Sequence, residues 1–166
     1  MEDKLKKIAI IFLILLLVGM TFSCKSGPKI EGEVTQDKVN DALQSIYDQY
    51  RSKLDMTGAK DYTIAKGDTL SQITRNNYGD LTDVGDAGPN NGFYFPVIMM
   101  ASESKIVDPD FIEPDMKLKI VDLKKNLAIP ASRKAIKDCL NDVAYVYNKK
   151  GQQATEDGLK KLAASL

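Results

Sequence analysis

Two stretches of this 166-residue chain decide its central fold: YTIAKGDTL at residues 62–70 and DPDFIEPDMKLKI at residues 108–120. In the first, Tyr62 and Ile64 alternate with polar or small residues, and in the second Leu118 and Ile120 alternate with lysines. This alternation is typical of short strands with one buried face. Gly67 tolerates positive φ and permits a sharp turn after the first strand.

Two short helices are predicted between these strands. Thr69, or Asp68 beside it, can cap the first helix, and Thr69 with Gln72 has capping-box spacing. Asn77 and Gly79 mark its end, and Pro96 can open a second helix over residues 97–104. Because two strands alone are marginal in water, the helices must hold them. The predicted core is Tyr62, Ile64, Leu70, Ile73, Val97 or Ile98, Met100, Ile112, Leu118 and Ile120.

The strand, the Gly-Asp-Thr-Leu helix start at 67–70 and the Pro-turn-strand closure at 114–120 occur in the order that characterises one family. The segment 61–122 resembles the LysM domain, a glycan-binding module of cell-wall proteins. The resemblance implies a shallow groove for chitin-like or peptidoglycan chains, with loops 67–70 and 105–112 as its walls. The glycan-binding residues that it implies are Gly67, Asp68, Thr69, Leu70, Val107, Asp108, Pro109, Asp110 and Ile112.

Three features depart from the family pattern. The second loop lacks the early Asn, and Pro114-Asp115 replaces the usual Pro-Gly, which favours a type I turn over a glycine-requiring type II turn. The third is an inserted loop at 80–95, which we expect at the end of the module opposite the groove. Its aromatic run 93–95 would pin the loop to the domain, with a partner-binding edge as the alternative. Asp83, Asp86, Asn90 and Asn91 do not fit the EF-hand pattern, so no metal site is predicted.

Within the predicted groove, Asp108 and Asp110 are the polar residues least suited to a core or capping role. We therefore expect both to be surface residues that orient the glycan. Their replacement by Ala should then leave stability nearly unchanged.

The N-terminus predicts secretion and lipidation. A basic start precedes an apolar run from Ile8 to Val18, which is too short to span a bilayer and is typical of a signal peptide, here residues 1–23. A small residue, Ser23, directly precedes Cys24 and resembles a loose bacterial lipobox of the spirochaete kind. This implies acylation of Cys24, for example with palmitate, and a lipidated tether at 24–33. The alternatives are an uncleaved anchor or ordinary cleavage near Ser23.

Composition excludes several function classes. Basic and acidic residues number 23 each, so no basic excess points to nucleic acid. The chain has no His, which excludes His-based triads and the common zinc sites. A carboxylate-pair glycosidase needs a deep cleft, for which the small module leaves little room. The sequence predicts a binding protein with no cofactor rather than an enzyme. Cys139, in an apolar surrounding, reads as a buried thiol, with a reactive thiol as the alternative.

Helices flank the module on both sides. An amphipathic helix is predicted within residues 34–57, and C-terminal helices within 130–166, with breaks near 150. The fold class is therefore α+β, with a βααβ LysM-like module inserted between α-helices. We expect the two long helices to bury their apolar stripes against each other, with tyrosines near the seam. The alternative is that either helix docks on an envelope partner.

Together these features predict a lipid-anchored protein of the bacterial cell envelope, facing the periplasm or the surface, that binds peptidoglycan through the groove. The alternative is an envelope adaptor that binds a protein partner through the inserted loop or the flanking helices, without glycan affinity.

Overall fold

A computed structural model describes residues 29–79, 91–102 and 108–166 of the chain. The predicted signal peptide, the lipidation residue Cys24, most of the inserted loop and the groove residue Val107 lie outside the described residues. Within the described ranges, no helix combines the length and the apolar character needed to cross a bilayer.

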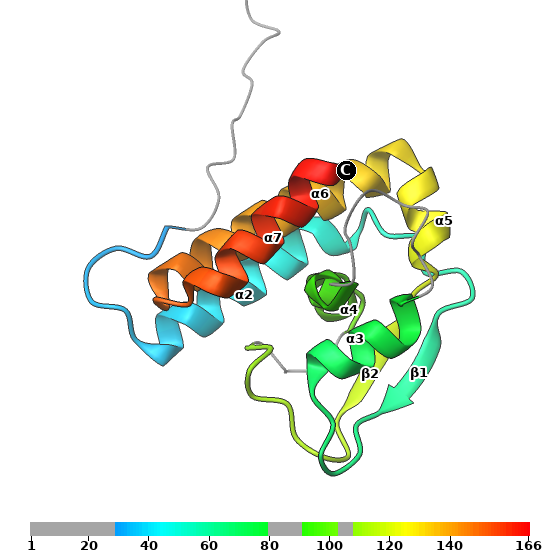
Figure 1. Cartoon of the computed structure of the whole chain (residues 1–166), viewed down its shortest axis with the longest axis horizontal. Helices are drawn as coiled ribbons and strands as arrows, with labels where there is room; N and C mark the ends of the chain where they lie inside the picture. Colours follow the sequence, from blue (N-terminus) through cyan, green and yellow to red (C-terminus); the bar gives the residue numbers. More distant parts are fainter. Residues whose placement is uncertain (1–28, 80–90, 103–107) are drawn as a thin grey trace, which may run out of the picture.

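The fold is α+β, as predicted, and is built from a helical layer packed against a small mixed unit (Figure 1). The helical layer contains α2 (Gln36–Arg51), α6 (Pro130–Lys149) and α7 (Gln153–Ser165). The mixed unit contains β1 (Lys60–Thr63), α3 (Leu70–Tyr78), the 3-10 turn η1 (Asn91–Tyr94), α4 (Phe95–Ala101) and β2 (Lys117–Ile120). A short helix, α5 (Leu123–Ala128), which the sequence did not predict, leads from β2 to α6.

The two strands form one antiparallel pair, in which Lys60 lies opposite Ile120 and Thr63 opposite Lys117. The predicted alternation of β2 is confirmed, because Leu118 and Ile120 are buried whereas Lys119 pairs with Asp61 across the strands at 2.6 Å. One face of the sheet is therefore covered by protein and the other is wet.

The turn before β2 differs from the expectation. Met116 N–H donates to Glu113 C=O at 3.3 Å, and Asp115 has a φ of 69°, in the left-handed region. A positive φ at the third position is the signature of a type II turn, so the expected type I turn is wrong. The cause is the sheet register: Asp115 N–H must also reach Ile64 C=O, at 2.9 Å. An aspartate thus occupies a position that favours glycine.

Asp115→Gly is therefore expected to stabilise the fold by about 0.5–1 kcal/mol, since relief of left-handed strain outweighs the entropy that glycine gains on unfolding. Asp115→Ala is the control, because it removes the carboxylate but keeps the Cβ. Chemical denaturation checks the order: the Gly variant should have the higher midpoint, and an Ala variant of equal or higher stability would contradict the strain argument.

Helix α4 is the centre of the molecule and is buried along its whole length (Figure 1). It begins at Phe95 and ends at Ala101, one residue before the expected start at Pro96 and short of the expected end at 104. Ser102 explains the end, because its hydroxyl donates to Ile98 C=O at 2.7 Å and accepts from Lys119 N–H at 2.9 Å. This side chain fastens α4 to β2.

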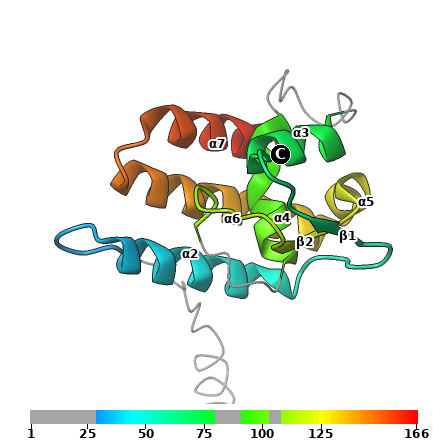
Figure 2. The same ribbon diagram turned by 90° about the horizontal axis from the view of Figure 1, so that it is seen from below.

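The flanking helices pack on each other, as predicted. Figure 2 shows α6 lying between α2 and α7. At the seam Tyr47 and Tyr147 are buried, and the Tyr50 hydroxyl donates to Asp142 at 2.8 Å. The apolar stripes of α2 and α6 are thus covered within the chain. Cys139 of α6 is a buried free thiol, as preferred from the sequence, and burial raises its pKa.

Residues 29–33 are fastened to the helical layer. Ile30 is buried, and Lys38 Nζ donates to Glu31 C=O at 3.0 Å and to Glu33 C=O at 2.9 Å.

Candidate functional site

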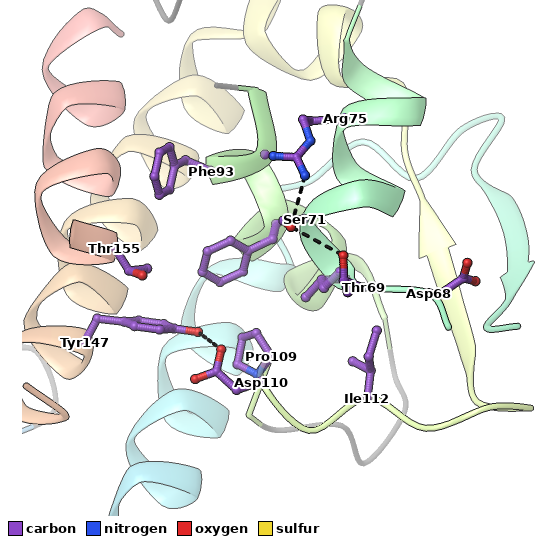
Figure 3. A pocket seen from close by; sticks show the side chains of 13 residues that line it. Asp68, Thr69, Ser71, Arg75, Phe93, Pro109, Asp110, Ile112, Tyr147 and Thr155 are labelled. Carbon is purple, nitrogen blue, oxygen red and sulfur yellow. Dashed lines mark hydrogen bonds between the residues drawn. The ribbon is translucent and has the colours of Figure 1, made fainter. Parts of the chain in front are cut away.

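A pocket of about 460 Å³ lies where the mixed unit meets the helical layer (Figure 3). Six of the residues singled out from the sequence line it: Asp68, Thr69, Leu70, Pro109, Asp110 and Ile112. The structure therefore brings the two predicted loops together around one hollow. Of the remaining three, Gly67 forms the preceding turn, Asp108 lies behind the second loop, and Val107 is outside the described residues.

The first wall is the turn from β1 into α3. Gly67 has a φ of 92°, which explains the glycine. The Asp68 carboxylate accepts hydrogen bonds from the Tyr62 hydroxyl and from Ala65 N–H, both at 2.8 Å. The hydrogen bond with Tyr62 raises the pKa of the Tyr62 hydroxyl. Asp68 closes the turn and is not the helix cap. Thr69 is the cap: its Oγ1 accepts from Gln72 N–H at 3.3 Å and donates to Gln72 Oε1 at 3.1 Å.

The start of α3 supplies unpaired donors. The first N–H groups of a helix have no intrahelical acceptor. Thr69 accepts hydrogen bonds from the N–H groups of Gln72 and Ile73. The N–H groups of Leu70 and Ser71 have no acceptor among the described residues. Both residues line the pocket.

The second wall overturns one expectation. Asp108 is only 4% exposed, and its carboxylate accepts from Lys150 Nζ at 3.0 and 2.9 Å and from Gln36 Nε2 at 2.8 Å. Lys150 Nζ also donates to Asp110 at 2.5 Å. The prediction that both are surface residues without a structural role is wrong for Asp108, which α2 and the α6–α7 turn cover. Asp110 is exposed, as predicted, but its carboxylate is bound by side chains of α6 and the α6–α7 turn. We call Asp108, Asp110 and Lys150, with their hydrogen-bond partners, the Lys150 network.

Asp110 connects this network to the pocket. Its carboxylate also accepts from Gln152 Nε2 at 3.0 Å and from Tyr147 hydroxyl at 3.1 Å. Burial by itself raises the pKa of Asp110, but the hydrogen bond and charge of Lys150, with Gln152 and Tyr147, outweigh it and hold the pKa below its usual value. Asp110 is therefore ionised at neutral pH, with its oxygens occupied by the protein's own donors.

A third wall was not foreseen. Tyr147 of α6, Thr155 of α7 and Phe93 of η1 line the side of the pocket that faces the helical layer (Figure 3). The expectation that the aromatic residues of the insertion lie at the far end is wrong for Phe93 and Phe95, which both line the pocket. The reason is that η1 packs along α3: a Cβ on Gly92 would lie 3.6 Å from the Ser71 Cβ in the first turn of α3.

Phe93 is held by a glycine of α7. A Cβ added at Gly158 would lie 2.1 Å from the nearest ring atom of Phe93, so the ring packs directly on the helix backbone. A glycine inside a helical pattern signals such a close approach, and Gly158 is the feature of the sequence that carries this signal.

The contact between Gly158 and Phe93 predicts that Gly→Ala at position 158 does not have its usual stabilising effect. In a helix, Gly→Ala normally stabilises by about 1 kcal/mol. Gly158→Ala alone is expected to give no gain or a loss, because the new methyl displaces the Phe93 ring. In a Phe93→Ala background the same change should give the full gain. A double-mutant cycle by chemical denaturation measures the coupling, and equal gains in both backgrounds would contradict the packing argument.

No family model, curated protein or solved structure matches this chain.

Proposed function

We propose that this chain is a lipid-anchored cell-envelope protein that binds peptidoglycan glycan in the three-walled pocket. The observation that carries the proposal is that residues of both loops that the LysM resemblance names as groove walls, 67–70 and 105–112, line one hollow. The LysM-like module supplies two walls, and Tyr147 and Thr155 of the flanking helices, with Phe93 of the insertion, supply the third.

The chemistry of the pocket suits an N-acetylated sugar. Leu70, Phe93 and Ile112 offer apolar surface for a sugar ring face or an acetamido methyl. The N–H groups of Leu70 and Ser71 offer donors for an acetamido carbonyl. The volume, about 460 Å³, lies within the range of ligand pockets.

The proposed mechanism is bivalent tethering. Acyl chains on Cys24 hold the protein to a bacterial membrane, and the pocket holds a wall glycan. Because the anchor raises the effective concentration of wall near the pocket, weak intrinsic affinity is sufficient.

Sedimentation of the purified full chain with isolated sacculi tests the proposal. We expect the wild-type protein to co-sediment, and Thr155→Trp to weaken co-sedimentation about tenfold, because the indole fills the third wall and excludes the sugar; tenfold corresponds to about 1.4 kcal/mol. Gln153→Trp is the matched control. It puts the same side chain on the exposed part of α7, two residues and roughly 200° away around the helix.

The outcomes separate the two functions predicted from the sequence. If the wild-type chain does not co-sediment, the glycan proposal fails and the envelope adaptor is the remaining reading. If both Trp variants weaken binding equally, the contact surface is not the pocket. The adaptor function has one candidate binding surface fewer, because the apolar stripes of α2 and α6 are buried against each other and cannot bind a partner.

A further inference from the structure

One charged side chain of the pocket takes no part in the Lys150 network or in the turn before α3. Arg75, on α3, lines the pocket beside Phe93 and Ser71 (Figure 3). We propose that Arg75 binds a carboxylate carried on the side of the glycan chain, so that the pocket prefers an acidic, peptidoglycan-type chain over a neutral chitin-type chain. This inference rests on the proposed function and names the substrate class of the same site.

The guanidinium of Arg75 has unused hydrogen-bonding capacity. A guanidinium carries five N–H donors in a planar fork that fits a carboxylate. Among the described residues, its hydrogen-bond acceptor is Ser71 Oγ, at 3.5 Å, which is the limit of a hydrogen bond. No carboxylate of the described residues lies within ion-pair distance of Arg75.

Gly92 leaves room for this guanidinium. A Cβ at position 92 would lie 3.4 Å from Arg75 Nη1, at the short end of ordinary van der Waals contact. The absence of a side chain at Gly92 lets the guanidinium lie against the backbone of η1, at the edge of the pocket.

The two carboxylates of the pocket do not offset this positive charge by pairing with it. Asp68 is held by Tyr62 and Ala65, and Figure 3 shows it on the opposite side of Thr69 from Arg75. Asp110 is held by Lys150, Gln152 and Tyr147. A ligand carboxylate would therefore meet an available cation, whereas a ligand cation would find both acids already engaged.

The neighbouring surface fixes where that carboxylate must sit on the ligand. Phe93 lines the same pocket as Arg75, with its ring on the α7 side (Figure 3). A matching ligand has an apolar sugar face with an acid group beside it. A neutral N-acetylglucosamine chain has no such acid. In peptidoglycan every second sugar carries a lactyl ether, whose carboxylate is either free or extended by a peptide with carboxylates of its own.

Calorimetric titration of the full chain, purified in detergent, tests the inference with three oligosaccharides of equal length. One is the neutral N-acetylglucosamine oligomer, one alternates it with the lactyl-bearing sugar, and one carries a short acidic peptide on each lactyl group. We expect an acid-bearing oligomer to bind at least about tenfold more tightly than the neutral one, equivalent to about 1.4 kcal/mol. Whichever acid-bearing oligomer binds more tightly than the neutral one shows whether Arg75 binds the lactyl carboxylate or a carboxylate of the peptide.

Variants assign the preference to Arg75. Arg75→Gln should reduce the preference for acid-bearing oligomers to about twofold or less, and Arg75→Lys should retain part of it. Lys161→Gln is the control, because it removes one exposed positive charge outside the pocket. Carboxyl-reduced lactyl oligomer should bind like the neutral oligomer.

Two results would overturn the inference in distinguishable ways. If the wild type binds all three oligomers equally, or if Arg75→Gln leaves the preference unchanged, the Arg75 assignment fails and the glycan pocket stands. If no oligomer binds and sacculi do not retain the protein, the proposed function fails with it.

Discussion

Replacing Lys150 by Met is expected to destabilise the fold by about 3–5 kcal/mol, because it leaves a buried carboxylate without its cation. The Asp108 side chain is 2% exposed and that of Lys150 is 11% exposed, so water cannot replace the lost partner. The change also frees the loop 108–112 from the α6–α7 turn, and with it the second wall of the pocket. Urea denaturation followed by circular dichroism measures the loss.

Lys149→Met is the matched control for this prediction. It makes the same chemical change one residue away, on an exposed side chain, and should alter stability by less than about 0.5 kcal/mol. Adding Asp108→Asn and Asp110→Asn to the Lys150→Met variant should recover part of the loss, because the buried charges are then removed. A Lys150→Met variant as stable as the Lys149→Met control would refute the network.

The pH dependence of the network follows from the direction of the Asp110 shift. In the folded state the pKa of Asp110 is lowered from 3.8. Burial raises this pKa, but the hydrogen bond and the charge of Lys150 outweigh the effect of burial. Its contribution to stability is therefore complete above about pH 3.8 and is lost as the pH falls through the lower, folded value. In Lys150→Met this contribution is smaller, because Asp110 loses the hydrogen bond and the charge of Lys150 and keeps Gln152 and Tyr147 as donors. The stability difference between wild type and variant should thus shrink on acidification.

Leu118→Ala is expected to cost about 2–5 kcal/mol of the free energy of unfolding, because it leaves a cavity in the only core that covers the sheet among the described residues. Leu118 is 1% exposed and lies opposite Tyr62 in the strand pair. Small domains have about 5–15 kcal/mol in total, so the thermal midpoint should fall markedly.

Lys117→Ala, on the exposed face of the same strand, is the control and should change the midpoint little. The urea dependence of the unfolding free energy should be equal in both variants, which would show that the native fold is kept. A loss below about 1 kcal/mol for Leu118→Ala would mean that the site collapses and that β2 contributes less to the core than its burial indicates.

The sequence alone determined the local structure of this protein. Thr69 and Gln72 lie three residues apart, and their spacing is sufficient to place the start of α3. The alternation at 116–120 determined which face of β2 is buried, and Pro130 marked the start of α6. Each of these features depends on interactions within about four residues, and a linear pattern records them. The two pocket loops were identified in the same way, through short motifs.

Only the tertiary structure decided what covers those loops. Asp108 and Lys150 are 42 residues apart, and no spacing rule connects them. The partners become apparent when α2 and the α6–α7 turn are placed over the second wall, and they bury Asp108, which was expected at the surface. Phe93 joined the pocket because η1 packs along α3 and against Gly158. Asp115 adopted a glycine-like φ because strand register, set by both strands together, outweighs the preference of one residue. Motifs in the chain identified two walls of the pocket; long-range packing supplied the third wall and brought Arg75 to its edge.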